Sequence, residues 1–191
     1  ATAPTLTLAQ AADQVDPAKN AAIRFTLSAN ESLDAATITA SDFTVTNGGT
    51  PTITGSGSSY TVTTTASGQG NVVIALSGTF SVSDPAGNAA TTASGSDRTV
   101  TFDSVAPTLT LQQAAGQADP TNGSSIQFTL SSNETIDAST LTASDVAVTN
   151  GSTPTITGSG TSFTLTVTAS GQGDVTIAPS AGFSVSDPAG N

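Results

Sequence analysis

The sequence lacks the residues on which most enzyme and transition-metal chemistry depends. Its 191 residues include no Cys, His, Met or Trp. Without Cys and His, the chain has no disulfide, no thiol nucleophile, no His-based triad and no imidazole or thiolate metal ligand. Paired carboxylates serve glycosidases, but aromatic residues that would line a sugar cleft make up only 4 % of the chain. We therefore predict that the protein is not an enzyme, and that any metal it binds is a hard cation held by oxygen ligands.

Positive charge and long apolar runs are also scarce. Lys19, Arg24 and Arg98 are the only basic residues, and with 14 Asp and Glu the formal net charge is −11. A chain without a basic patch is unsuited to binding a nucleic-acid backbone. No apolar run approaches the ~20 residues that span a membrane, and the first residues lack the pattern of a signal peptide. We expect no nucleic-acid partner and no membrane insertion, and we expect the chain to be a piece of a longer protein.

The sequence contains two copies of one unit. When residues 1–88 are placed on residues 104–191, a shift of 103 positions, 60 of the 88 pairs are identical and no gap is needed. A period of this length exceeds the ~20 to 50 residues of a solenoid repeat and fits a complete domain. We predict one repeat at 1–103 and a second at 104–191. The second repeat lacks an equivalent of residues 89–103, and therefore its last strand.

Alternation of apolar and polar residues predicts β-strands along each copy. Ile23, Phe25 and Leu27, for example, alternate with polar residues, as expected for a strand with one buried face. Clusters of Gly, Asn and Pro separate such segments and predict turns; Gly68-Gln69-Gly70 is expected to close a hairpin. Many short strands with frequent turns indicate an all-β fold of two tandem immunoglobulin-like antiparallel Greek-key sandwiches.

Acidic residues recur at matching positions of the two copies. Glu31 matches Glu134, and Asp84 matches Asp187 in the repeated segment SVSDPAGN. In a sandwich whose first and last strands run in the same direction, the loop before the last strand and the loop after the second strand lie at the end where the chain enters the domain. These two loops contain the matching acids. The topology therefore predicts that the acidic loops meet at one end of each repeat.

Carboxylates that meet at one point repel each other unless a cation joins them. Ca²⁺ is the expected partner because it takes 6 to 8 oxygen ligands from carboxylates, amides and water. In the second repeat, Asp103 in the linker would join the two acidic loops, so that an ion would fix the joint between neighbouring repeats. We predict seven ligands: Glu31, Asp84 and Asn88 in the first repeat, and Asp103, Glu134, Asp187 and Asn191 at the junction with the second.

Local turns provide an alternative explanation for the acids. In DPAGN, Asp can cap the turn through its side chain while Pro and Gly set the backbone angles. Asp34 and Asp42 are expected to cap local turns, and Asp16-Pro17 is expected to form a turn, rather than to bind an ion. Asp13 and Asp16 follow the first strand and are expected at the opposite end of the repeat.

These residues resemble a known family. The order FTLS-x-NE, SDFTVTNG, TITGSGSSYTVT, SVSDPAGN and TVTFDSVAPTLTL is similar to the bacterial Ig-like (Big) repeats of giant surface adhesins, including biofilm-associated and RTX-type proteins. The resemblance covers the first copy and all of the second copy that is present. It implies an extracellular extender at the bacterial cell surface, with Ca²⁺ at the joints between neighbouring repeats. It also implies ligand roles for Asp84, Asn88, Asp187, Asn191, Asp103, Glu31 and Glu134.

Two other functions remain open at the level of sequence. Thr-rich strand faces would suit a module that binds glycan or ice, and a flat Thr array would favour that function. The second copy's missing strand would leave a sheet edge that can accept a strand from another chain. That edge would allow self-association or assembly into an extracellular filament.

Overall fold

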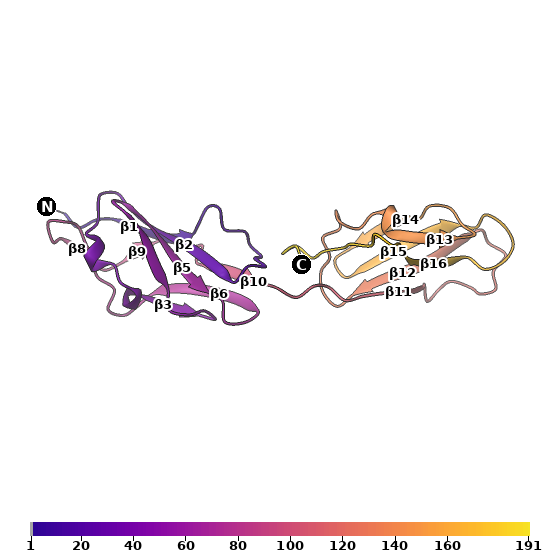
Figure 1. Ribbon diagram of the computed structural model, residues 1–191, viewed down its shortest axis with the longest axis horizontal. Helices are drawn as coiled ribbons and strands as arrows, with labels where there is room; N and C mark the ends of the chain where they lie inside the picture. Colours follow the sequence, from indigo (N-terminus) through magenta and orange to yellow (C-terminus); the bar gives the residue numbers. More distant parts are fainter. Residues whose placement is uncertain (1) are drawn as a thin grey trace. The chain divides into compact units, whose positions relative to one another are not determined.

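The computed structural model describes residues 2–191 as an all-β protein (Figure 1). Two compact units make up the chain: the first unit, Ala1–Ser104, and the second unit, Val105–Asn191. Among the described residues, no helix is long and apolar enough to cross a membrane. The helical segments that occur are short 3-10 turns: η1 (Ala35–Thr37), η2 (Ala40–Asp42) and η3 (Ala143–Asp145). The all-β, antiparallel fold predicted from the alternation of apolar residues is confirmed.

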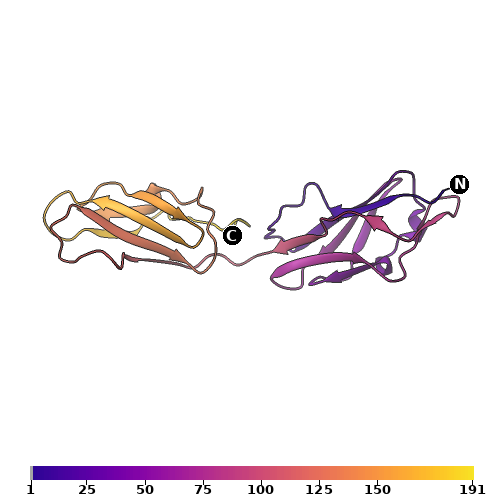
Figure 2. The same ribbon diagram turned by 180° about the vertical axis from the view of Figure 1, so that it is seen from behind.

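Two packed sheets form the first unit, seen from opposite sides in Figure 1 and Figure 2. The larger has the strand order β4-β5-β2-β1-β9, and the smaller has the order β10-β6-β3. All pairings in them are antiparallel except that of β1 with β9, which is parallel. The strands are β1 (Leu6–Gln10), β2 (Ala22–Ala29), β3 (Phe43–Thr46), β4 (Thr52–Ser56), β5 (Ser59–Thr65), β6 (Gly70–Leu76), β9 (Ala93–Ser94) and β10 (Thr99–Phe102), with β7 (Val82–Ser83) and β8 (Ala89–Ala90) as a separate pair.

The core of the first unit lies between its two sheets. Leu8, Phe25 and Val62 project into it from β1, β2 and β5, and Val72 and Ile74 from β6; each is at most 1 % exposed. Alternate residues of one strand share a face, so the intervening Thr and Ser side chains lie on the outer surface. The two sheets therefore form a β-sandwich with one apolar interior.

The second unit repeats the larger sheet without its fifth strand. Its sheet has the order β11-β12-β15-β14, and a two-stranded sheet pairs β13 with β16. The pairings match those of the first unit, because Leu111 faces Leu130 as Leu8 faces Leu27. The strands are β11 (Leu109–Gln113), β12 (Ser125–Ser132), β13 (Val146–Thr149), β14 (Thr155–Ser159), β15 (Ser162–Thr168) and β16 (Thr176–Pro179).

One predicted turn is wrong. Gly68-Gln69-Gly70 does not close a hairpin, because β5 belongs to the larger sheet and β6 to the smaller one. The side chain of Asn47 holds this connection: its Nδ2 donates to the carbonyl oxygen of Gly68 at 2.8 Å and to those of Gln69 and Gly70 at 3.3 Å. Asn47 itself has a positive φ of 57°, which Asn tolerates better than most residues. A tertiary contact, rather than the local sequence, thus sets the direction of the chain here.

Candidate functional site

The DPAGN segment of the first unit is a closed turn built around the Asp84 carboxylate. Oδ1 of Asp84 accepts hydrogen bonds from the backbone N–H groups of Ala86 at 2.8 Å and Asn88 at 2.9 Å. Oδ2 accepts one from Nδ2 of Asn88 at 2.7 Å. Gly87 has a φ of 83°, a backbone conformation that glycine adopts without steric cost. The Asp84 side chain is only 5 % exposed. Its hydrogen bonds hold the loop in this conformation, as the turn interpretation predicted.

The second unit contains the same turn. Oδ1 of Asp187 accepts from the N–H of Asn191 at 3.1 Å, and its Oδ2 accepts from the Nδ2 of Asn191 at 3.0 Å. Asp187 is 2 % exposed. Because each Asn side chain directs its amide nitrogen at the carboxylate, its amide oxygen is turned away from that carboxylate. Each turn therefore carries a buried carboxylate and an adjacent amide oxygen, both of which are oxygen ligands that Ca²⁺ accepts.

A second loop is hydrogen bonded to the residues just before each turn. In the first unit the N–H of Asp34 donates to the carbonyl of Ser83 at 2.8 Å, and the N–H of Ser83 donates to Oγ1 of Thr37 at 3.0 Å. In the second unit the N–H of Asp137 donates to the carbonyl of Ser186 at 2.8 Å. Glu31 and Glu134 lie in these loops, three residues before the bonded Asp. The predicted meeting of the two acidic loops at one end of each repeat is confirmed.

The segment that leads into each unit joins the same end. The backbone N–H of Thr5 donates to Oδ1 of Asn30 at 2.7 Å, and the N–H of Asn30 donates to the carbonyl of Thr5 at 3.2 Å. Thr108 and Asn133 form the same pair of bonds in the second unit, at 2.6 and 3.2 Å. Sequence reasoning missed this role of Asn, although the signal was present: Asn precedes Glu in both copies. Each unit therefore gathers three segments at one end.

Two carboxylates of the second unit lie near each other. One oxygen of Glu134 and one of Asp187 lie within 4.8 Å of each other. Within the described part of the first unit, residues 2–104, no three carboxylates approach one another this closely. Asp103 follows β10, is half-buried, and donates its N–H to the carbonyl of Ala18 at 2.9 Å.

The remaining acidic candidates are engaged elsewhere in the first unit. Asp34 caps η1 through the N–H of Ala36 at 3.0 Å, and Oδ2 of Asp42 accepts from the N–H of Thr39 at 2.7 Å. Asp16 accepts from the N–H of Thr101 at 2.9 Å, and Asp13 pairs with Arg24 at 3.0 Å. Asp34 and Asp42 act as caps, as predicted from their turn contexts. The bond from Thr101 to Asp16 joins the loop of Asp16 to β10.

The hydrogen bonds of the two turns shift the pKa of their carboxylates. The side-chain and backbone N–H groups of Asn88 hold the pKa of Asp84 below its ordinary value, although burial opposes them. Burial acts to raise the pKa of Asp187, but the hydrogen bonds from Asn191, Ala189 and Gly190 together outweigh it, and that pKa is also lowered. Both carboxylates are therefore ionised at neutral pH.

This lowered pKa predicts an acid-dependent loss of stability in the first unit. A carboxylate whose pKa is lower in the folded state stabilises the fold above the unfolded pKa, and the stabilisation disappears as the pH falls through the folded value. We expect the Asp84→Asn variant to melt at a lower temperature at pH 7, because Asn offers one acceptor oxygen where Asp offers two. We also expect its midpoint to depend less on pH below about pH 4. Thermal unfolding followed by circular dichroism from pH 7 to pH 2 measures both effects; parallel pH curves for the variant and the parent would contradict the assignment.

No family model and no curated protein matches this chain. The arguments for its function therefore rest on its sequence and its geometry.

Proposed function

We propose that this chain is a pair of structural extender repeats from an extracellular adhesin of the bacterial cell surface, and that Ca²⁺ stiffens the joint between them. The observation that supports it is the convergence of three chain segments at one end of the second unit, where carboxylate oxygens of Glu134 and Asp187 lie within 4.8 Å of each other. In this role the protein holds an adhesive region away from the cell, and so supports adhesion or biofilm formation, and it catalyses no reaction.

The charges of the second unit favour a bound cation. Residues 105–191 include six acidic residues and no Lys or Arg. Asp187 is buried with its carboxylate ionised, and bringing a second carboxylate close to it is unfavourable unless positive charge is supplied. Ca²⁺ suits the available donors better than Mg²⁺, which requires a small and nearly ideal octahedral shell.

The proposed ligands come from the segments on both sides of the linker. Glu134, Asp187 and Asn191 would be the ligands from the second unit. Asp103 would be the ligand from the first unit, since it precedes Thr108 by five residues in the chain and Thr108 is bonded into the same end of the second unit. An ion held by both units would restrict the linker, so its mechanical effect would exceed its effect on either fold. Glu31, Asp84 and Asn88 would form the equivalent group toward a preceding repeat.

Thermal unfolding with and without Ca²⁺ tests the proposal. We expect about 10 mM Ca²⁺ to stabilise the second unit by about 1–3 kcal/mol relative to EGTA, given a dissociation constant of ~0.1 to 1 mM, as in extracellular calcium modules. For a domain of this size, that raises the unfolding midpoint by about 5–15 °C. We expect Mg²⁺ at the same concentration to have a smaller effect.

Three variants locate the ion. Glu134→Gln and Asp103→Asn are expected to remove most of the calcium shift while leaving the EGTA midpoint nearly unchanged. Asp174→Asn is the matched control, because it removes one negative charge from an exposed position outside the acidic loops. Asp187→Asn is less informative, since it also breaks the turn. An unfolding midpoint that is the same in Ca²⁺ and in EGTA would rule out this site. So would a calcium-induced shift of the midpoint that Asp174→Asn reduces as much as Glu134→Gln does.

Binding to glycan or ice is a second candidate, favoured by rows of hydroxyl groups on the outer face of the larger sheet. Such rows also arise because cross-strand Thr pairs stabilise sheets, and Tyr60, the only Tyr, is buried, so it offers no stacking surface for sugar. Inhibition of ice recrystallisation or retention on a glycan resin would favour this candidate. The rows are Thr54, Thr61 and Thr26 in the first unit and Thr157, Thr164 and Thr129 in the second.

A further inference from the structure

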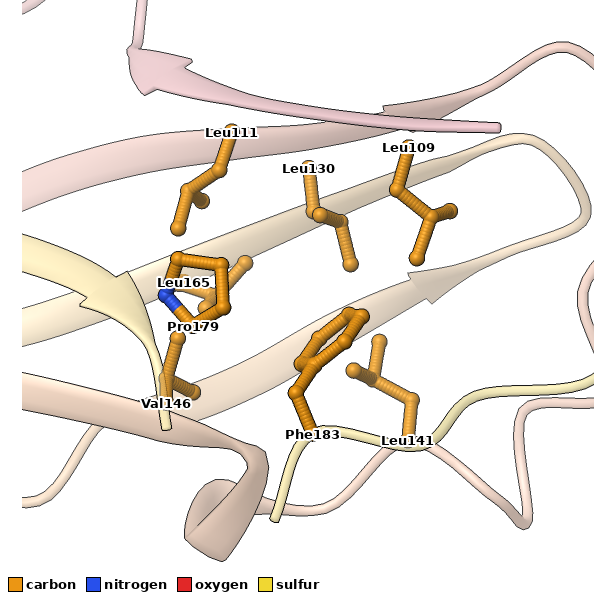
Figure 3. A pocket seen from close by; sticks show the side chains of 8 residues that line it. All are labelled: Leu109, Leu111, Leu130, Leu141, Val146, Leu165, Pro179 and Phe183. Atoms are coloured by element: carbon orange, nitrogen blue, oxygen red, sulfur yellow. The ribbon is translucent and has the colours of Figure 1, made fainter. Parts of the chain in front are cut away.

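The core of the second unit is open along one side. Six apolar positions that are buried in the first unit are half-buried in the second, although all six residues keep their identity and the sheets keep their pairing. Nearby, a pocket of about 120 Å³ enters the core, and Leu109 and Leu111 line it from β11 and Pro179 from β16. Figure 3 shows Leu109, Leu111 and Leu130 pointing into this pocket opposite Pro179 and Phe183. The six positions are Leu109, Leu111, Val175, Ile177, Phe183 and Val185, the counterparts of Leu6, Leu8, Val72, Ile74, Phe80 and Val82.

The first unit shows what covers these positions when they are buried. Residues 93–102 run along the sandwich there, pairing through β9 with the edge of β1 and through β10 with the edge of β6. Val100 is fully buried and Phe102 packs against the core. In the second unit, the corresponding edges of β11 and β16 have no strand paired to them within the described residues. The open pocket and the two unpaired edges thus border one slot.

We propose that this slot of the second unit binds an extended segment with the sequence of residues 89–103, in the register that the segment adopts in the first unit. In that register Val100 lies opposite Val175, and Thr99 opposite Thr176, as they lie opposite Val72 and Val73 in the first unit. The parallel part places Ala93 beside Leu109, as it lies beside Leu6. The complex would bury the half-exposed residues and pair both edges, which is a recognised mode of peptide binding.

The slot selects a particular sequence, because the segment makes contacts that few strands can reproduce. Gly95 has a φ of 112°, and a methyl group there would overlap the carbonyl oxygen of Leu8. The guanidinium of Arg98 donates to the carbonyl of Leu8 at 3.2 Å and to that of Ala93 at 2.7 Å. The N–H of Gln10 donates to the carbonyl of Asp97 at 2.6 Å. The acceptor at Leu8 and the donor at Gln10 have counterparts on Leu111 and Gln113 of β11, so the second unit offers the same backbone partners.

A titration of the intact chain with a synthetic peptide tests the proposal. The peptide carries residues 89–104, AATTASGSDRTVTFDS, with a fluorescent label, and the buffer contains EGTA so that calcium plays no part. We expect saturable binding of one peptide per chain, a higher unfolding midpoint for the second unit alone, and slower amide hydrogen exchange in β11 and β16. A failure here would leave the calcium proposal intact, because the two tests share neither ligand nor conditions.

Peptide variants and a fused chain identify the site. Gly95→Ala and Val100→Asp peptides are expected to bind at least about tenfold more weakly, because the first overlaps the strand edge and the second buries a charge in an apolar slot. A chain carrying the same segment joined after Asn191 through a flexible linker should no longer bind the peptide, since its slot is filled. Equal binding to the fused chain or no binding to the original chain would overturn the proposal. A dimer of the original chain that the peptide does not dissociate would also overturn it, because a different part of a second copy would then occupy the slot.

Discussion

Leu8→Ala is expected to lower the free energy of unfolding of the first unit by about 3–5 kcal/mol, whereas Leu111→Ala should cost the second unit only about 1–2 kcal/mol. The two residues occupy the same position of the repeat, but Leu8 is completely buried and Leu111 is half-exposed. Truncating a buried Leu removes its transfer free energy and leaves a cavity. At Leu111 part of the side chain already contacts water, and the adjoining pocket is open, so both contributions are smaller.

Chemical denaturation resolves the difference if the two units unfold in separate transitions. Each variant changes one transition, so the other serves as an internal reference. Thr7→Ala, an exposed substitution on β1, should alter stability by less than about 0.5 kcal/mol. Similar losses for Leu8→Ala and Leu111→Ala would mean that the second unit closes its core in solution, which would also count against the open slot.

Gly95→Ala is expected to destabilise the first unit by about 2–5 kcal/mol. Its positive φ disfavours any residue with a Cβ, at a cost of about 1–2 kcal/mol. The added methyl group also overlaps the carbonyl oxygen of Leu8, a backbone atom of β1 that cannot rotate away, and forced packing of this kind costs a further ~1 to 3 kcal/mol. The substitution should therefore separate β9 from β1 and expose the side of the core that residues 93–102 cover.

Gly57→Ala is the matched control for Gly95→Ala. Gly57 also has a positive φ, 65°, but no atom lies within 4 Å of the added methyl group, so only the backbone cost applies. The difference between the two variants in denaturant midpoint isolates the overlap with β1. Equal destabilisation by both would show that the segment moves away from Leu8 without loss, and that Gly95 has no packing role.

Much of the fold was predictable because strand alternation is a local property. Ile23, Phe25 and Leu27 appear as alternating apolar residues in the sequence and are all completely buried. The assignment of strands to sheets was not predictable in this way. The contacts of Asn47 send the chain from one sheet to the other after β5, and those contacts depend on residues more than twenty positions away.

The candidate site was also predictable from the sequence only in part. Strand direction alone predicted that the loops containing Glu134 and Asp187 meet at one end, because an antiparallel arrangement fixes which loops share an end. The internal bonding of the turn was foreseen only in part: the sequence indicated that Asp187 could cap it, but not that the Asn191 side chain would bond to the same carboxylate. Side-chain distances of this kind depend on rotamers and burial, which the pattern of residue types does not specify.

The parallel contact between β1 and β9 determines how the first unit responds to tension. Leu6 lies opposite Ala93, the Arg98 guanidinium reaches the carbonyl of Leu8, and Gln10 bonds to Asp97. A pull on the two chain ends draws these neighbouring segments in opposite directions along their length. Their bonds are then loaded in shear and must break together, instead of peeling apart one at a time, so the unit gains resistance to force from the same segment that closes its core.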